Sequence, residues 1–148
     1  MGTSGFRSHL ARVRYALRLA FTEDHPPQLI AVSFAIGVFV TTLPTGGIGI
    51  PVLAWVGYRF DWANRLALFA AVVVLNPLVK GGVYVLSVVI GIQLVGPLPD
   101  GTDLELGWDV GAGVLVRLLV GNAVLAVGLA VVGYFVAYRT AHTVHQRR

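Results

Sequence analysis

Lys80 is the one lysine of the 148-residue chain, and it lies in an apolar stretch, VVVLNPLVKGGVY (72–84), that Asn76–Pro77 and Gly81–Gly82 interrupt. A lysine ammonium inside a bilayer costs from about 2.5 to more than 10 kcal/mol, so it must reach a polar cavity, free carbonyls or an anion. Pro77 frees a carbonyl one turn earlier, and the Asn76 amide can bond to such groups. These residues predict a site for an anionic headgroup or phosphate. The alternative is that Lys80 lies near the membrane surface and extends its ammonium to water.

A second interruption of the same kind precedes it, with Leu43–Pro44 followed by Gly46–Gly47. Paired Pro/Gly breaks in two hydrophobic segments are typical of transporters that bind their substrate inside the membrane. The sequence therefore predicts one binding site at both breaks, and the alternative is full-length helices that bend at the prolines. The predicted substrate-binding residues are Pro44, Gly46, Gly47, Asn76, Pro77 and Lys80.

No arrangement typical of an enzyme accompanies these breaks. The chain has no cysteine and no evident pairing of a nucleophile with a base. His142 and His145 lie three residues apart without an acidic neighbour, which is a poor pattern for zinc. The basic residues sit at the ends of apolar segments and form no phosphate-binding face, so nucleic acid is not expected as a partner. We expect a protein that is not an enzyme and that uses no cofactor and no metal.

Three polar residues lie in the later apolar segments. Asn122 and Gln93 are expected to form hydrogen bonds between helices. Arg117 is expected to extend its guanidinium outward to the membrane surface.

The composition indicates a membrane protein. Hydrophobic residues make up 56% of the chain and charged residues 12%, whereas soluble domains carry about 25% charged residues. The charged residues gather in four segments, 7–24, 59–65, 100–109 and 139–148. We predict an all-α, polytopic integral membrane protein with broken or re-entrant helices, located in the cell membrane.

The chain divides into three predicted regions. Residues 1–24 contain a basic amphipathic helix, with Arg7, Arg14 and Arg18 on one face, that can lie on a bilayer surface. An ordinary soluble helix packed on a partner is the alternative for this segment. Residues 25–138 form the membrane domain, and residues 139–148 form a basic cytoplasmic tail.

The lengths of the apolar runs indicate how the chain enters the membrane. A crossing needs about 20 residues, which residues 110–138 supply, whereas the runs 29–43, 48–58 and 66–75 are too short. Basic residues favour the cytoplasm, so both termini and the 59–65 loop are predicted there and the acidic 97–109 loop outside. Residues 27–58 must then return to their starting side, and residues 66–96 must cross once with a break inside.

The residues around both breaks resemble a widespread family of small prokaryotic membrane proteins that is catalogued as a domain of unknown function. Its first motif matches AVSFAIGVFVTTLPTGG (31–47) and its second matches NPLVKGGVY (76–84). Val79 and Gly82 depart from the Thr and Pro that are usual there, and Lys80 is not part of the pattern. The resemblance covers about residues 25–100. Some members are joined to glycosyltransferase-like domains, which implies lipid-linked sugars or polyprenyl phosphates. The matching residues are Ala31, Phe34, Ala35, Gly37, Phe39, Pro44, Gly47, Asn76, Pro77 and Tyr84.

The leading functional prediction is the transport or binding of an anionic lipid or lipid-linked phosphate at the two breaks. The expected partners are membrane lipids, with an anionic headgroup or polyprenyl phosphate as ligand, and a homo-oligomer stays open. The alternatives are a non-catalytic accessory or scaffold protein and a small channel built around TGGIG (45–49).

Overall fold

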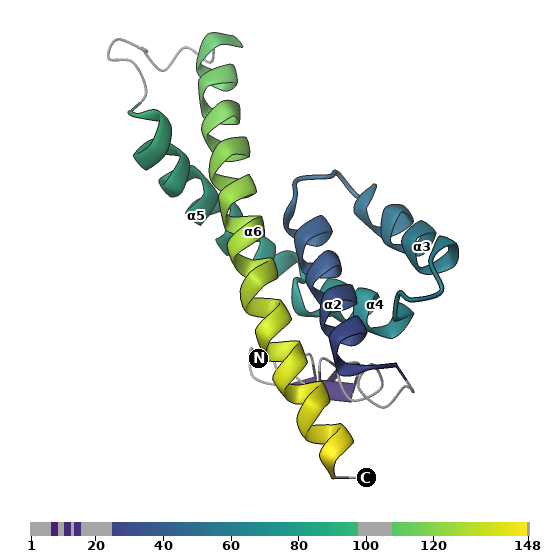
Figure 1. Ribbon diagram of the computed structural model, residues 1–148. Helices are drawn as coiled ribbons and strands as arrows, with labels where there is room; N and C mark the ends of the chain where they lie inside the picture. Colours follow the sequence, from purple (N-terminus) through teal and green to yellow (C-terminus); the bar gives the residue numbers. More distant parts are fainter. Residues whose placement is uncertain (1–6, 9–10, 13, 16–24, 98–107, 148) are drawn as a thin grey trace.

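The computed structural model describes residues 7–8, 11–12, 14–15, 25–97 and 108–147, with only the backbone for 108–110. This part is all-α, as predicted, and contains no strand (Figure 1). Residues 7–8, 11–12 and 14–15 are helical and exposed, but the rest of the 1–24 segment and the acidic residues of the 97–109 loop lie outside the described residues. The helices are α2 (Pro27–Thr42), α3 (Gly49–Arg59), α4 (Arg65–Val74), α5 (Pro77–Val95) and α6 (Trp108–Gln146).

Both Pro/Gly interruptions end a helix and do not merely bend it. α2 stops at Thr42 because Leu43 precedes Pro44, and a residue before proline is driven out of the helical region; its φ and ψ are −62° and 145°. Asn76, which precedes Pro77, is likewise extended, with φ −64° and ψ 170°. Pro77 then opens α5, where its missing N–H has no helical partner to lose. The chain therefore forms separate helices at these prolines, and the alternative of continuous kinked helices is wrong.

α6 is a 39-residue helix that serves as the common partner of α2 and α5. α2 runs antiparallel along its C-terminal half, and Phe34 and Val38 lie close to Gly133. α5 runs antiparallel along its N-terminal half, and Ser87 lies against Gly121 (Figure 1). The two broken segments thus occupy different halves of one helix.

α4 packs across α2 and completes the apolar core. The backbone of α2 approaches α4 closely at Gly37, where an added Cβ would lie 2.6 Å from the Leu68 carbonyl oxygen. The Asn64 N–H, at the start of α4, donates a 2.8 Å hydrogen bond to the Ser33 hydroxyl oxygen. The apolar core is formed by α2, by α4 with its C-cap Leu75, and by the C-terminal part of α6. Its buried residues are Ile30, Ala31, Phe34, Val38, Ala67, Ala70, Ala71, Leu75, Ala137 and Ala141.

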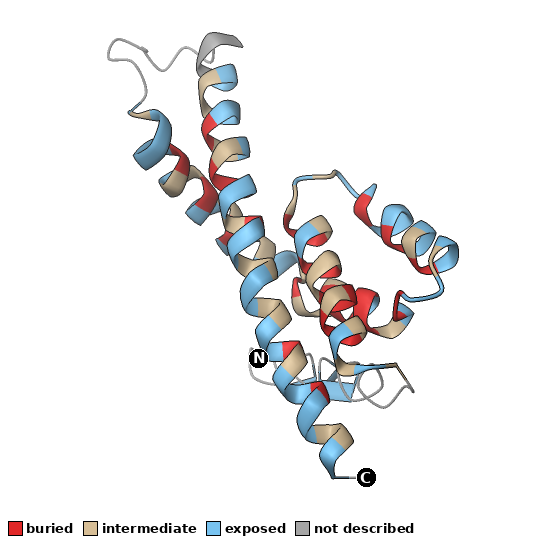
Figure 2. Cartoon of the chain, viewed as in Figure 1, coloured by how far each residue is buried: buried red, intermediate tan, exposed pale blue. Residues whose placement is uncertain are grey.

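α3 returns from the end of α2 to the start of α4 and packs less closely than the other helices. Its Leu53 contributes to a second cluster with Ala63 and Leu68. Most of its outer face is exposed (Figure 2), and Trp55 and Tyr58 are among its exposed residues. α2 and α3 therefore form a helical hairpin with the 43–48 turn at its tip.

Within the described residues, two helices are long and apolar enough to cross a membrane, α5 and residues 111–146 of α6. The buried share of the most apolar window is 17% in α5 and 22% in α6 (Figure 2). The core helix of a soluble protein would have most of this apolar surface covered by the rest of the chain. The exposed apolar surface of α5 and α6 thus indicates membrane association.

The helix boundaries differ from the predicted apolar runs at two ends. α5 begins at Pro77 and so includes Lys80 in its first turn. α6 continues past residue 138 to Gln146, so most of the predicted 139–148 tail is helical. The apolar pattern missed both ends because a helix continues through polar residues wherever its backbone bonds are satisfied.

The crossing of α5 and α6 generates the first prediction. A Cβ at position 121 would collide with the Ser87 carbonyl oxygen, whereas a Cβ at position 128 meets nothing within 4 Å. Gly121→Ala should therefore force the helices apart and lower the free energy of unfolding by about 1–3 kcal/mol, the usual cost of overpacking. Thermal unfolding of the detergent-solubilised protein, followed by circular dichroism, measures this change. Gly128→Ala is the matched control, and an equal response of both variants would contradict the close crossing.

Candidate functional site

The first break forms a tight, exposed turn at the tip of the α2–α3 hairpin. Pro44, Gly46 and Gly47 are exposed. Gly46 and Gly47 have φ of 60° and 99°, which other residues rarely adopt. The Thr45 hydroxyl oxygen accepts a 3.2 Å hydrogen bond from the Gly49 N–H and so caps α3. The turn thus reverses the chain between two half-helices.

The second break is shorter and consists of Leu75 and Asn76. The Asn76 side-chain oxygen accepts a 2.9 Å hydrogen bond from the Val79 N–H, and the Asn76 carbonyl accepts one from the Lys80 N–H. Asn76 therefore caps α5 and leaves fewer free N–H groups for a ligand. The Lys80 side chain is half-buried and forms no hydrogen bond or ion pair with the described residues. Lys80 is thus placed one turn into the helix with its ammonium uncompensated.

The two breaks differ in formal charge. Each joins the C-terminus of one helix to the N-terminus of the next, α2 to α3 at the first break and α4 to α5 at the second, so partial charges of both signs are present at both. Lys80, in the first turn of α5, adds a full positive charge at the second break. An anion is therefore stabilised more at Asn76–Lys80 than beside Pro44.

Asn122 connects the two broken segments in the interior. Its Nδ2 donates to the Thr42 carbonyl oxygen of α2 at 3.1 Å and to the Ser87 hydroxyl oxygen of α5 at 3.2 Å. Asn122, Thr42 and Ser87 are all fully buried. We refer to Thr42, Ser87 and Asn122, which these bonds join, together with Thr41, the buried neighbour of Thr42 in the sequence, as the Asn122 cluster. It holds the end of α2, just before Pro44, against the middle of α5, so the structure joins the first break to α5 through α6.

The expectation that Asn122 bonds between helices is confirmed. Gln93 is exposed on α5, and its expected bond between helices is not formed with the described residues. Ser87 and Thr42 were not predicted, because a hydroxyl in an apolar helix usually bonds to its own backbone. Both do so here, to Val83 and Val38. Nothing in the local sequence indicates that they also meet Asn122.

Arg117 corrects another expectation, since it does not extend outward. It is 9% exposed, and its Nε and Nη2 donate to the carbonyl oxygens of Gly96 and Pro97 at 2.8 and 2.7 Å. Its Nη1 donates to the Gly113 carbonyl oxygen at 2.9 Å. The planar guanidinium suits several carbonyls at once, and it satisfies the end of α5, where helical N–H partners are lacking. Arg117 therefore fastens α5 to α6.

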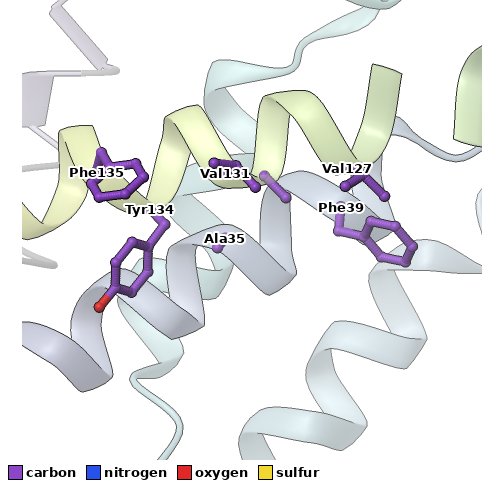
Figure 3. Close-up of a pocket in the computed structure, with 7 residues that line it drawn as sticks. Ala35, Phe39, Val127, Val131, Tyr134 and Phe135 are labelled. Carbon is purple, nitrogen blue, oxygen red and sulfur yellow. The ribbon is translucent and has the colours of Figure 1, made fainter. Parts of the chain in front are cut away.

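An apolar groove runs along the outer contact of α2 and α6 (Figure 3). Its volume is about 410 Å³, and its lining side chains are apolar except for Tyr134, which carries a hydroxyl (Figure 3). Such a surface can hold a hydrocarbon chain. The lining residues are Ala35, Phe39, Val127, Ala130, Val131, Tyr134 and Phe135.

The fold and the site together define a class of protein: an all-α chain with two helices of membrane-spanning length, in which two broken segments meet on one long helix. The chain belongs to the family described as an uncharacterized protein conserved in bacteria (DUF2062), whose model matches residues 10–148. This match confirms the resemblance seen in the sequence. No curated protein and no solved structure matches the chain.

The Asn122 cluster generates the second prediction. Asn122→Leu removes two interhelical hydrogen bonds, each worth about 0.6 kcal/mol on average and up to about 1.7 in membrane proteins. We expect the free energy of unfolding to fall by about 1–3 kcal/mol. Denaturant unfolding in detergent measures this, with Gln93→Leu, an exposed amide, as the control. If Asn122→Leu were as stable as the control, the cluster would not hold the three helices together.

Proposed function

We propose that this protein is an integral membrane protein that binds and translocates an anionic amphiphile, such as an anionic lipid or a lipid-linked phosphate, without catalysing a reaction. The single observation that carries the proposal is the position of Lys80. Lys80 is half-buried in the first turn of an apolar helix, and its side chain has no hydrogen-bond or ion-pair partner among the described residues. An uncompensated cation at a helix N-terminus suits an anionic group.

Lys80 lies on the stripe of α5 that faces α6, because Ser87 and Gly91 follow it by seven and eleven residues and lie against α6. Leu78, Val85 and Val89 lie on the opposite face of α5 and are 80%, 65% and 49% exposed. In a bilayer that face contacts lipid hydrocarbon, which supports the membrane setting of the proposal, and the contact with an anionic head rests on Lys80. The full positive charge of Lys80 supports a position of the head at Asn76–Lys80. Pro44, Gly46 and Gly47 then shape the hairpin tip and are not the main anion contacts.

The proposed topology has α5 and α6 crossing the membrane, while α2 enters, α3 returns, and α4 leads into α5. The lengths support it, because α2, α3 and α4 have 16, 11 and 10 residues, fewer than the about 20 that a crossing needs. Aromatic rings lie close together where α3 ends. The centre of the Phe60 ring lies 6.0 Å from that of Trp55 and 5.6 Å from that of Trp62. Trp and Tyr are enriched at membrane surfaces, and basic residues near this end, with those of the C-terminus, favour the cytoplasmic side.

A scaffold role is the second candidate, and one observation favours it. Added Cβ atoms at Gly81, Gly82 and Gly128 would meet nothing within 4 Å. Exposed small residues allow close approach of a helix from another chain in a membrane. In that case the breaks would be structural and Lys80 would have no ligand.

The topology generates the third prediction, which uses the absence of cysteine from the chain. In intact cells, a membrane-impermeant maleimide should label Asp103→Cys, whereas Arg147→Cys should react only after the membrane is opened. Pro44→Cys, at the hairpin tip, should react far more slowly than either in opened membranes. Rapid labelling of Pro44→Cys from the cytoplasmic side, with the cysteine-free parent as blank, would place the tip in water and refute the re-entrant hairpin.

Lys80 generates the fourth prediction. Lys80→Met should weaken binding of an anionic lipid by about tenfold or more, because a hydrogen bond to a charged group contributes about 1.5–3 kcal/mol. Native mass spectrometry of the purified protein with phosphatidylglycerol or undecaprenyl phosphate, against phosphatidylcholine, measures this. Lys80→Arg should retain most of the binding, and Arg147→Met is the control for charge alone. Unchanged binding by a folded Lys80→Met variant would favour the scaffold role.

A further inference from the structure

Two buried side-chain oxygens near the end of α2 have no hydrogen-bond partner among the described residues. They are Thr41 Oγ1 and Asn122 Oδ1. Thr41 is 6% exposed and Asn122 is fully buried. An unpaired buried polar group carries the full cost of its lost hydration, and the cost is greater where hydrocarbon surrounds the protein. Two such atoms lie on neighbouring helices, and each needs a hydrogen-bond donor or a cation as its partner.

The orientation of the Asn122 amide is determined by its neighbours. The Ser87 hydroxyl gives its hydrogen to the Val83 carbonyl oxygen at 2.7 Å, so its oxygen can only accept from Asn122. The Thr42 carbonyl can also only accept. Both therefore require the Nδ2 side of the amide, and the opposite orientation would lose both bonds. Asn122 Oδ1 is therefore the amide atom that has no hydrogen-bond partner among the described residues.

Thr41 lies on the face of α2 that packs against α6. It follows Phe34 by seven residues and Val38 by three, and both of these side chains lie close to Gly133 of α6. It also precedes Thr42, whose carbonyl bonds to Asn122. Unlike Thr42, whose hydroxyl donates to the Val38 carbonyl oxygen at 2.7 Å, Thr41 makes no bond within its own helix.

The Asn122 cluster is rich in lone pairs and poor in free hydrogens. A carbonyl and a hydroxyl oxygen each have two lone pairs, so Thr42 O and Ser87 Oγ each keep one after accepting from Asn122. Both Nδ2 hydrogens and the Thr42 and Ser87 hydroxyl hydrogens are already donated. The cluster therefore offers oxygens from four residues and one free hydrogen, that of Thr41.

The local charge favours a positive ligand. The C-terminus of α2 lies here and adds a partial negative charge. The cluster contains no carboxylate, which divalent ions such as Ca²⁺ generally require. Asp61, the one acidic residue whose side chain the structure describes, is exposed in the loop before α4. Neutral oxygens at the C-terminal end of a broken helix are the surroundings in which transporters hold a monovalent cation.

We propose that the Asn122 cluster binds a desolvated monovalent cation, with Na⁺ as the probe of this class. The cation accepts lone pairs from Thr41 Oγ1 and Asn122 Oδ1, and the remaining lone pairs of Thr42 O and Ser87 Oγ extend the set. Because its oxygen ligands come from α2, α5 and α6, the cation stabilises the contact of the α2–α3 hairpin with α5 and α6. This inference is independent of the anionic ligand, although together the two sites would make a cation-coupled transporter.

The fifth prediction tests this site through stability. The full chain is unfolded by heat in detergent, with tryptophan fluorescence as readout, in NaCl, KCl or choline chloride at equal ionic strength. At a cation concentration 100-fold above Kd, the wild-type Tm should exceed that in choline by about 5 °C or more. Thr41→Val, which replaces the hydroxyl without breaking a bond described above, should lose this increase. Thr140→Val, an exposed threonine of α6, should retain it.

Two results would overturn the proposal. One is an equal wild-type Tm in all three salts, which would mean that water fills the site. The other is a Thr41→Val variant whose cation response equals that of the wild type. Should Thr41→Val not fold, binding of ²²Na⁺ to the wild-type protein, displaced by unlabelled Na⁺ and not by choline, decides the question, and its absence refutes the site. Lys80→Met should keep the cation response, so failure of the anionic ligand and failure of this site give different results.

Discussion

A polar side chain that is buried among apolar helices must find its hydrogen bonds inside the protein, and Asn122 does so across two helices. Its amide donates to the end of α2 and to the middle of α5. A shift of either helix along α6 would leave buried acceptors unpaired, which hydrocarbon penalises more than water does. The positions of the hairpin tip and of α5 are therefore linked through one side chain.

Close backbone contact reinforces this arrangement because α6 touches both broken segments where side chains are small. Gly121 lies against α5 and Gly133 lies against Phe34 and Val38 of α2. In a membrane, where the lipid is as apolar as the helix, such packing and interhelical hydrogen bonds provide most of the association energy. Arg117 adds bonds to the carbonyls that follow α5. The fold thus combines one polar cluster, one capping arginine and glycine contacts along a single helix.

Much of the fold could be predicted from local rules. The helix ends at Pro44 and Pro77 follow from the steric effect of proline on the preceding residue, and the all-α class follows from the apolar runs. The tertiary partners could not be predicted, because the Ser33–Asn64 bond joins residues 31 apart and Arg117 bonds to carbonyls 20 and 21 residues away. The site residues were predicted from their types alone. The positive charge at the second break follows from Lys80 in the sequence, whereas its position in the first turn of α5 became clear from the structure.

The length of α6 has a consequence for the cell surface on which it ends. Its 39 residues extend about 58 Å, whereas the hydrocarbon core is about 30 Å thick. If α6 crosses the bilayer, close to half of it projects into the aqueous phase unless it tilts steeply. Ala137 and Ala141 pack in the core with Ile30 and Ala31, so the last turns of α6, with Arg139, His142 and His145, would then emerge from the membrane beside the start of α2.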